Sequence, residues 1–308
     1  MRIAVPDLVS NSYFPAVAAV ELGFFKSQGM DVELEMVFPV GRAMQALRDG
    51  DVDFVAGPAH ATPSAFTDWR GARLLAALSQ HTFWVLVLRA DLGVQPGDVA
   101  AIKGLRIGAA PGPDAALRRL LVEAGVDPEG DGVALGPVPG SGEAGVSFGV
   151  HAAQALREGI IDGFWANAMG AEVAIRSGVG AVALDPRQGL GPPPARDFTF
   201  AALVATERLI EQTPAAAQGA VLAIVAAQRA LRADPSLAVD VGRRLFPPDE
   251  AQLIEDLVRR DSPYYTAEIA PDSVASLNDF CRSLGSLSAD VAYDQVVAVD
   301  FAHLWTQR

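Results

Sequence analysis

The sequence has very little of several things that would point to a particular chemistry. Its 308 residues include one cysteine, Cys281, and four histidines. A single cysteine excludes an internal disulfide and any metal site built from several thiolates. Cys281 stands in the helical-looking stretch SVASLNDFCRSLG, where a buried structural thiol is the better interpretation and a nucleophile the weaker one.

Long hydrophobic runs and an excess of positive charge are also absent. No stretch resembles a transmembrane helix or a signal peptide, and the opening MRIAVPDL predicts a strand from its second residue. We therefore expect no membrane insertion. Two compartments stay open: the cytoplasm for the chain as written, or the periplasm if a leader has been removed. The formal net charge of −13 disfavours nucleic acid and anionic membranes as partners.

Motifs for phosphate and metal binding are lacking as well. The run GSGEAG at residues 140–145 is superficially like a glycine-rich phosphate loop, but no GKS/T follows and no helix immediately begins. No HxH or HxxxH spacing occurs. A zinc or iron site that used His60 and His81 would also need a third ligand. We expect neither a metal nor a cofactor.

What the chain does contain is a pattern of alternating strands and helices. Half of the residues are hydrophobic, enough for one large domain or two lobes. Strand-like runs such as RIAV, VELEMV and VDFVAG alternate with helical patterns such as RAMQALRDG. This alternation predicts parallel sheets covered by helices. After the strand-like FTFAALVAT, which follows Asp197, the chain is mostly helical.

Two internal echoes indicate a duplicated unit. QALRDG at Gln45–Gly50 returns as QALREG at Gln154–Gly159, an offset of 154 − 45 = 109, and each is followed by a short apolar run with an aspartate. A looser echo joins MRIAVPDL at the start to LRIGAAPG from Leu105. Two echoes in the same order predict two lobes built alike.

Breaks near Arg89 and Asp197 divide these lobes. The first is RADLGVQPGD, and GLGPPPA at Gly189–Ala195 is the strongest linker signal in the chain. We expect lobe one to hold residues 1–88 and 198–308, including the C-terminal helices, and lobe two to hold residues 89–197. Two crossings make a hinge, and hinged lobes close on ligands.

In the order of its motifs, the chain resembles the substrate-binding proteins of ABC importers, in the SsuA/THI5-like (NMT1) branch. The resemblance is carried by AAVELGFFKSQGMDVE, GRAMQALRDGDVDFV, KGLRIGA, ALREGIID and the C-terminal VAYDQVVAVDFAHLW. It implies a type II periplasmic-binding-protein fold, α/β, with a ligand cleft between two lobes. It also implies a small-molecule ligand and an ABC permease as partners.

The same resemblance leaves an enzyme open, because decarboxylases, desulfinases and a pyrimidine synthase share this superfamily. The cysteine-rich motif of the yeast pyrimidine synthase is absent, and the first lobe has no cysteine to act as a desulfinase nucleophile. No nucleophile-base pair can be read from the sequence. Binding for import is therefore preferred over catalysis, with a cytoplasmic ligand sensor as a third hypothesis.

Candidate ligand-binding residues follow from one rule. In open α/β sheets, ligands bind beyond the carboxyl ends of the strands. In lobe one this rule selects Asn11, Ser12, Tyr13, Phe38, Arg42, Pro58, His60, Gln80 and His81. In lobe two it selects Pro111, Gly112, Trp165 and Asn167, together with the loop Gly140–Gly142.

Four of these residues carry specific expectations. Tyr13 and Trp165 are candidates for flat contact with a ligand ring, and Arg42 for pairing with a carboxylate, sulfonate or phosphate. His60 either contacts the ligand or is a half-exposed imidazole bonded to a backbone carbonyl. In the enzyme alternative, His60 or His81 would act as acid/base. The preferred ligand is a small aromatic or heterocyclic molecule that can be anionic, such as a thiamine precursor, sulfonate or aromatic acid.

Overall fold

The chain folds into two compact α/β units. The computed structural model describes residues 1–141 and 147–306. Unit 1 comprises Met1–His81 and Thr199–Arg308, and unit 2 comprises Thr82–Phe198. The chain therefore leaves unit 1 once and returns to it once.

The first crossing lies earlier than the break near Arg89 indicated. Strand β5 (Val85–Arg89) belongs to unit 2, where it pairs with β8 (Gly163–Ala166) and β9 (Gly180–Leu184). The glycine- and proline-rich signal marks the loop after this strand, whereas the crossing itself lies before the strand. The expected assignment of residues 82–88 to lobe one is thus corrected by the strand pairing, and the return crossing falls between Phe198 and Thr199.

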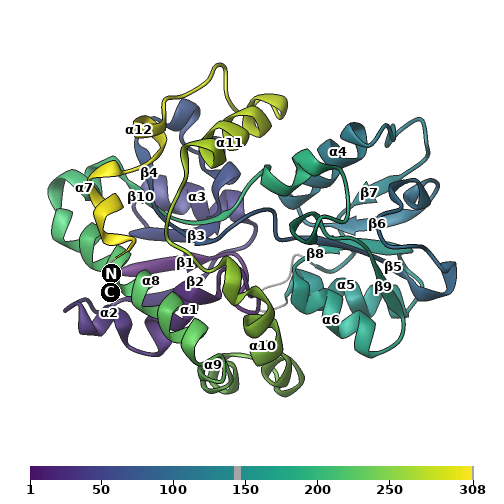
Figure 1. Ribbon diagram of the computed structural model, residues 1–308, viewed down its shortest axis with the longest axis horizontal. Helices are drawn as coiled ribbons and strands as arrows, with labels where there is room; N and C mark the ends of the chain where they lie inside the picture. The colour runs from purple at the N-terminus through teal and green to yellow at the C-terminus, as the bar shows by residue number, and fades with distance from the viewer. Residues whose placement is uncertain (142–146, 307–308) are drawn as a thin grey trace. The chain divides into compact units, whose positions relative to one another are not determined.

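Unit 1 is a five-stranded sheet with helices on both faces (Figure 1). Its remaining strands are β1 (Arg2–Val5), β2 (Glu33–Met36), β3 (Phe54–Pro58), β4 (Ala72–Ser79) and β10 (Ala201–Thr206). Its helices are α1 (Phe14–Glu21), α2 (Phe24–Ser27), α3 (Val40–Asp49), α7 (Glu207–Gln212), α8 (Pro214–Ala233), α9 (Leu237–Leu245), α10 (Pro248–Asp261), α11 (Pro271–Ser283) and α12 (Tyr293–Val296). Figure 1 shows α3, α11 and α12 on one side of the sheet and α1 and α8 on the other.

Unit 2 has a sheet of the same design. Besides β5, β8 and β9 it contains β6 (Arg106–Ala109), β7 (Ala134–Gly136), α4 (Pro113–Glu123), α5 (Phe148–Arg157) and α6 (Ala168–Arg176). The strand order is β2-β1-β3-β10-β4 in unit 1 and β7-β6-β8-β5-β9 in unit 2. Position by position, each strand has a counterpart in the other sheet, which makes the two sheets topologically equivalent.

Both sheets are mixed rather than fully parallel as the alternation predicted. In each, the fourth strand is antiparallel to both neighbours: β10 in unit 1 and β5 in unit 2. These are the first strands formed after each crossing. Each of these strands starts at the edge where its two neighbours end, so it must run in the direction opposite to theirs. The sequence alternation could not show this, because direction depends on where the chain re-enters a sheet.

The sequence echoes occupy equivalent places in the two sheets. The Asp53 carboxylate accepts a hydrogen bond of 2.7 Å from the backbone N–H of Arg2, and the Asp162 carboxylate accepts one of 3.0 Å from that of Arg106. In return, the N–H of each aspartate donates to the carbonyl of the same arginine, at 2.9 Å and 2.8 Å. These reciprocal bonds set the start of parallel pairing between β1 and β3 in unit 1 and between β6 and β8 in unit 2.

The repeated QALRDG and QALREG end their helices in the same way. The N–H of Asp51 donates to the carbonyl of Ala46 at 2.8 Å, and the N–H of Ile160 donates to that of Ala155 at 3.0 Å. The glycine before each donor has a positive φ, 83° at Gly50 and 71° at Gly159. Glycine is favoured there because a Cβ would strain this backbone conformation.

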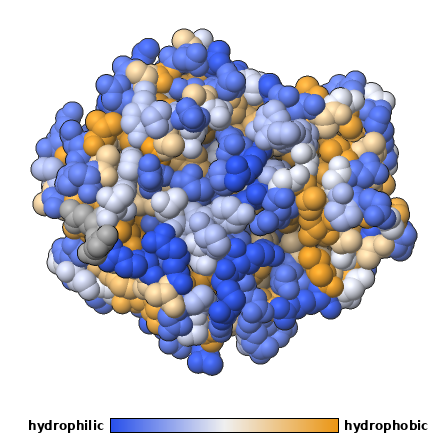
Figure 2. All heavy atoms as spheres, in the orientation of Figure 1, coloured by the Kyte–Doolittle hydropathy of each residue, from blue (hydrophilic) through white to orange (hydrophobic). Residues whose placement is uncertain are grey.

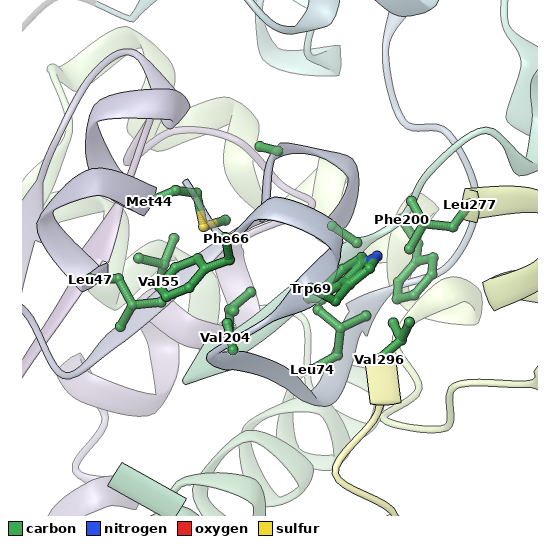
Figure 3. Close-up of a cluster of buried hydrophobic side chains, with 14 of the residues drawn as sticks. Met44, Leu47, Val55, Phe66, Trp69, Leu74, Phe200, Val204, Leu277 and Val296 are labelled. Atoms are coloured by element: carbon green, nitrogen blue, oxygen red, sulfur yellow. The ribbon is translucent and has the colours of Figure 1, made fainter. Parts of the chain in front are cut away.

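One core cluster of unit 1 lies between the sheet and the helices α3, α11 and α12. Figure 3 shows Met44 and Leu47 of α3 close to Val55 of β3, and Trp69 close to Leu74. Cys281 belongs to this cluster and is fully buried. Burial raises the pKa of the Cys281 thiol to about 12, so it is uncharged at neutral pH. The interpretation of Cys281 as a buried structural thiol is confirmed.

Hydrophilic residues cover most of the face shown in Figure 2. In the part of the chain that the structure describes, none of the helices is both long and apolar enough to span a bilayer.

The Asp162 cluster predicts a pH-dependent contribution to stability. Asp162 accepts hydrogen bonds from the guanidinium groups of Arg106, at 2.8 and 2.9 Å, and Arg89, at 3.4 Å. The hydrogen bond from Arg106 is the largest cause that holds the pKa of Asp162 well below its usual range. A depressed carboxyl pKa stabilises the fold above the unfolded-state value of about 3.9, and this stability is lost as the pH falls below it.

We expect Asp162→Asn to lower the free energy of unfolding at pH 7 by about 1–3 kcal/mol, nearer the lower end because both arginines are partly exposed. Below about pH 4 the difference from wild type should shrink. Asp53→Asn is the matched control and should cost less, since the Arg2 side chain pairs with Glu35 instead. Denaturant unfolding at pH 7 and pH 3 measures both. Equal effects at the two pH values would contradict the charge-based explanation.

Candidate functional site

In unit 1 the candidate site lies at one edge of the sheet, here called the carboxyl edge. There β1, β3 and β4 end and β10 begins, with Ala201 paired to both Pro58 and Ser79. The backbone segments that leave this edge carry most of the residues selected from the sequence. The strand-end rule therefore brings Asn11, Ser12, Tyr13, Pro58, His60, Gln80 and His81 to a common edge.

The loop after β1 buries polar atoms that have no partner. Ser10, Asn11 and Ser12 are at most 1% exposed. The hydroxyls of Ser10 and Ser12 and the Oδ1 atom of Asn11 make no hydrogen bond to any described residue. Leaving a buried polar group unsatisfied costs about 1–3 kcal/mol. Such groups gathered in one loop are what a site for a polar ligand requires.

The same loop is held in place by the end of α10 and the residues after it. The Asn11 amide Nδ2 donates to the carboxylate of Asp261, and the hydroxyl of Tyr265 donates to the Asn11 carbonyl at 2.6 Å. Tyr13 is also buried, and burial, followed by the nearby Asp7, raises the pKa of its phenol well above 10. The phenol is therefore neutral at physiological pH.

His60 lies in the short 3₁₀ helix η1 (Ala59–Ser64) that follows β3. It is 5% exposed, which corrects the half-exposed interpretation. Its Nδ1 lies 3.1 Å from the hydroxyl of Thr199, and its ring meets Phe280 edge-on at 5.3 Å. The neighbouring Thr62 is fully buried, and its hydroxyl has no partner among the described residues. Thr62 therefore adds a fourth unsatisfied atom to this edge.

Gln80 and His81 end β4 and are fastened to the segment after α10. The Gln80 side chain donates to the carbonyl of Glu268 at 2.6 Å, and its backbone N–H donates to that of Tyr264 at 3.0 Å. The His81 ring lies 5.9 Å from that of Tyr264. Residues 261–268 thus connect the loop after β1 to the end of β4. Within residues 1–141 and 147–306, no three His, Cys, Asp or Glu side chains are grouped to hold a metal ion.

Phe38 and Arg42 lie at the start of α3, after β2. Phe38 is half-buried, whereas Arg42 is exposed on the first turn of the helix. Arg42 has no ion pair with any residue that the structure describes. Its expected pairing with an anion stays a prediction.

In unit 2, Pro111 and Gly112 follow β6 and precede α4. Gly112 has a φ of 101°, a backbone conformation that residues other than glycine rarely adopt. Its N–H donates to the carboxylate of Asp114 at 2.9 Å. The Asp114 carboxylate therefore accepts a hydrogen bond from one of the backbone amides at this helix start. An anionic ligand would use the same amide. Of the predicted loop Gly140–Gly142, Gly142 lies outside the described residues.

Trp165 and Asn167 support the fold of unit 2. The Trp165 side chain is fully buried, donates from Nε1 to the Pro113 carbonyl at 3.1 Å, and lies 6.3 Å from Trp84. Asn167 caps α6, accepting from the Gly170 N–H at 3.1 Å. A ligand could stack on Trp165 only after a change of conformation, so that expectation stays a prediction.

Two further residues at the equivalent edge of unit 2 were missed. Arg187 follows β9, is 6% exposed, and lies 5.9 Å from the ring of Phe83. Thr82 is 1% exposed, and its hydroxyl has no described partner. The strand-end rule would have found Arg187 if GAVAL (Gly180–Leu184) had been counted as a strand. Thr82 precedes the first strand after the crossing, which the rule does not cover.

Comparison with known proteins places this fold in a family. Residues 8–243 match the NMT1-like family. That is more than half of the 308 residues. The chain belongs to the NMT1-like family. This confirms the resemblance seen in the motifs. No curated protein sequence matches the chain significantly.

Solved structures confirm the type II periplasmic-binding-protein fold. The periplasmic aliphatic sulphonate binding protein SsuA from Escherichia coli matches with a TM-score of 0.73 at 14% identity, covering 100% of this chain and 99% of that one. The periplasmic nitrate-binding protein NrtA from Synechocystis PCC 6803 matches at 0.69 and 18%, covering 99% and 86%. A mutant of the desulfurization enzyme DSZB, in complex with biphenyl-2-sulfinic acid, matches at 0.67 and 17%, covering 98% and 97%. At these identities the likeness establishes the fold.

The burial of Trp165 predicts a structural role. We expect Trp165→Ala to lower the free energy of unfolding by about 3–5 kcal/mol, because it opens a large cavity beside Trp84 and leaves the Pro113 carbonyl without its donor. Trp165→Phe fills most of the space and should cost clearly less. Thermal unfolding of the ligand-free protein measures both. An unchanged Tm in Trp165→Ala would show that this side chain is not needed for the packing of unit 2 and is available to contact a ligand.

Proposed function

We propose that this protein is a solute-binding protein that captures a small organic molecule between its two units and delivers it to an ABC permease. The preferred ligand is aromatic or heterocyclic. Membership of the NMT1-like family and the likeness to SsuA and NrtA support a binding role. A hinged pair of lobes would let ligand binding favour the closed state.

The observation that carries the proposal is the set of buried polar atoms without partners at the carboxyl edge of unit 1. Ser10, Ser12 and Thr62 contribute hydroxyls and Asn11 contributes Oδ1. Unsatisfied buried groups are rare in folded proteins and destabilise them. A ligand that bonds to these atoms would recover this free energy, which gives the protein affinity for a polar molecule at this edge.

The likeness to DSZB supports a second candidate, an enzyme on the same fold. One observation weighs against catalysis by a cysteine. Cys281 is fully buried and its thiol has a pKa raised to about 12, so it supplies no thiolate near neutral pH. Binding remains the function that the geometry supports best.

Two threonine-to-valine changes test the proposal. Thr62→Val removes a hydroxyl without a partner, so Tm of the ligand-free protein should stay the same or rise. Affinity for the ligand that co-purifies, identified by native mass spectrometry and measured by calorimetry, should fall roughly five- to a hundredfold.

Thr206→Val is the matched control. The Thr206 hydroxyl caps α7 by accepting from the Leu209 N–H at 3.1 Å, so its loss should cost about 0.5–2 kcal/mol of stability and leave affinity unchanged. Unchanged affinity in Thr62→Val, or conversion of the ligand into a product by the wild type, would argue against the proposed binding site or the binding role, respectively.

A further inference from the structure

The carboxyl edge of unit 1 also constrains the chemical class of the ligand, given that the protein binds a solute as proposed. The constraint begins with the orientation of one amide. Asn11 donates from Nδ2 to the buried carboxylate of Asp261. A carboxylate accepts hydrogen bonds only, so the amide nitrogen must face it and the amide oxygen must face the other way.

Because of this orientation, Asn11 Oδ1 is an acceptor with no partner among the described residues. Only an N–H or O–H donor can satisfy it. The hydroxyls of Ser10, Ser12 and Thr62 can either donate or accept, so they adapt to what the ligand offers. Among the four unsatisfied atoms, Oδ1 alone imposes a requirement, and the requirement is a hydrogen-bond donor.

The charges around this loop favour the same class. The Asp261 carboxylate contacts Asn11, and Asp7 is close enough to Tyr13 to help raise the pKa of its phenol. Arg260 partly offsets Asp261 at 3.6 Å, but its side chain is 44% exposed, so solvent screens it. A negatively charged ligand group placed beside Asn11 would lie close to the Asp261 carboxylate.

Among the described residues of unit 1, no arginine or lysine is buried to receive an anion. The buried charged side chains among its described residues are Glu250 and Asp261, which are both acidic. Arg42 is exposed on the first turn of α3, and the buried Arg187 belongs to unit 2. Within unit 1, an anionic group on the ligand would therefore meet no buried arginine or lysine among the described residues.

We propose that the carboxyl edge of unit 1 selects ligands that present a neutral or cationic hydrogen-bond donor, such as an amine or amide, to Asn11 Oδ1, and that Asp261 is the specificity-determining residue. A simple inorganic or organic anion without such a donor, of the kind named for SsuA and NrtA, is not the ligand. A zwitterion that carries an amine meets the requirement.

The first experiment identifies what the protein holds. The full chain is purified under native conditions, its small molecules are released by denaturation, and they are analysed by mass spectrometry in positive and negative modes. A compound with an N–H or O–H donor group that is neutral or cationic supports the inference. An anion without such a donor overturns it while leaving the proposed binding function intact.

Three probes with one ring and different head groups give an independent test. Benzylamine carries a cationic donor, benzamide a neutral donor, and benzoate an anionic acceptor. In a thermal-shift assay at millimolar concentration, benzylamine or benzamide should raise Tm and benzoate should not. A rise with benzoate alone overturns the inference. Absence of any released ligand together with no shift from any probe overturns the proposed function as well.

Variants then test the role of Asp261. Asp261→Asn removes the charge and lets the Asn11 amide turn over, so affinity for benzylamine or the released compound should fall about ten- to a hundredfold. The isosteric change Asp272→Asn, at an exposed position on α11, is the control and should leave affinity unchanged. Should Asp261→Asn fail to fold, Asp7→Asn removes another negative charge and should weaken binding several-fold. Wild-type affinity in whichever of the two variants is measured would overturn the assignment.

Discussion

Each unit depends on one parallel strand pair, β1 with β3 in unit 1 and β6 with β8 in unit 2, and an aspartate just before the second strand of each pair secures it. Asp53 bonds to the backbone of Arg2, and Asp162 bonds to that of Arg106. Once these strands are aligned, their carboxyl ends release the chain at one edge. The loops Ser10–Tyr13 and Ala59–Ser64 leave unit 1 there, which is why residues distant in sequence gather at one place.

Unit 2 has added side-chain interactions to the same backbone arrangement. Arg106 and Arg89 both pair with Asp162, whereas in unit 1 the Arg2 side chain pairs with Glu35. The backbone bonds are common to both units because they align the strands. The side-chain pairs differ because partly exposed ion pairs contribute little and are easily exchanged.

The two sheet edges differ in chemistry despite their common topology. In unit 1 the edge carries hydroxyls and an amide oxygen without partners, beside the Asp261 carboxylate. In unit 2 the Gly112 N–H donates to the Asp114 carboxylate, and the Trp165 indole donates to the Pro113 carbonyl. The Asn167 side chain accepts from the Gly170 N–H and caps α6. Among the described residues, the edge of unit 1 thus gathers four unsatisfied atoms, whereas these three groups of unit 2 have partners within the unit.

The sequence by itself determined the repeated helix-and-strand units, the buried Cys281 and the family, because these rest on local periodicity and on motifs read in order. The strand-end rule also selected Asn11, Ser12 and His60, which the structure places at one edge of the unit 1 sheet. Tertiary structure decided the rest. The direction of β5 and β10 depends on where the chain re-enters a sheet. The burial of His60 against Thr199 and the orientation of Asn11 by Asp261 join residues 139 and 250 positions apart, and no local pattern records contacts at such distances. Trp165 looks the same in sequence whether its indole faces a ligand or the Pro113 carbonyl, and only packing distinguishes the two.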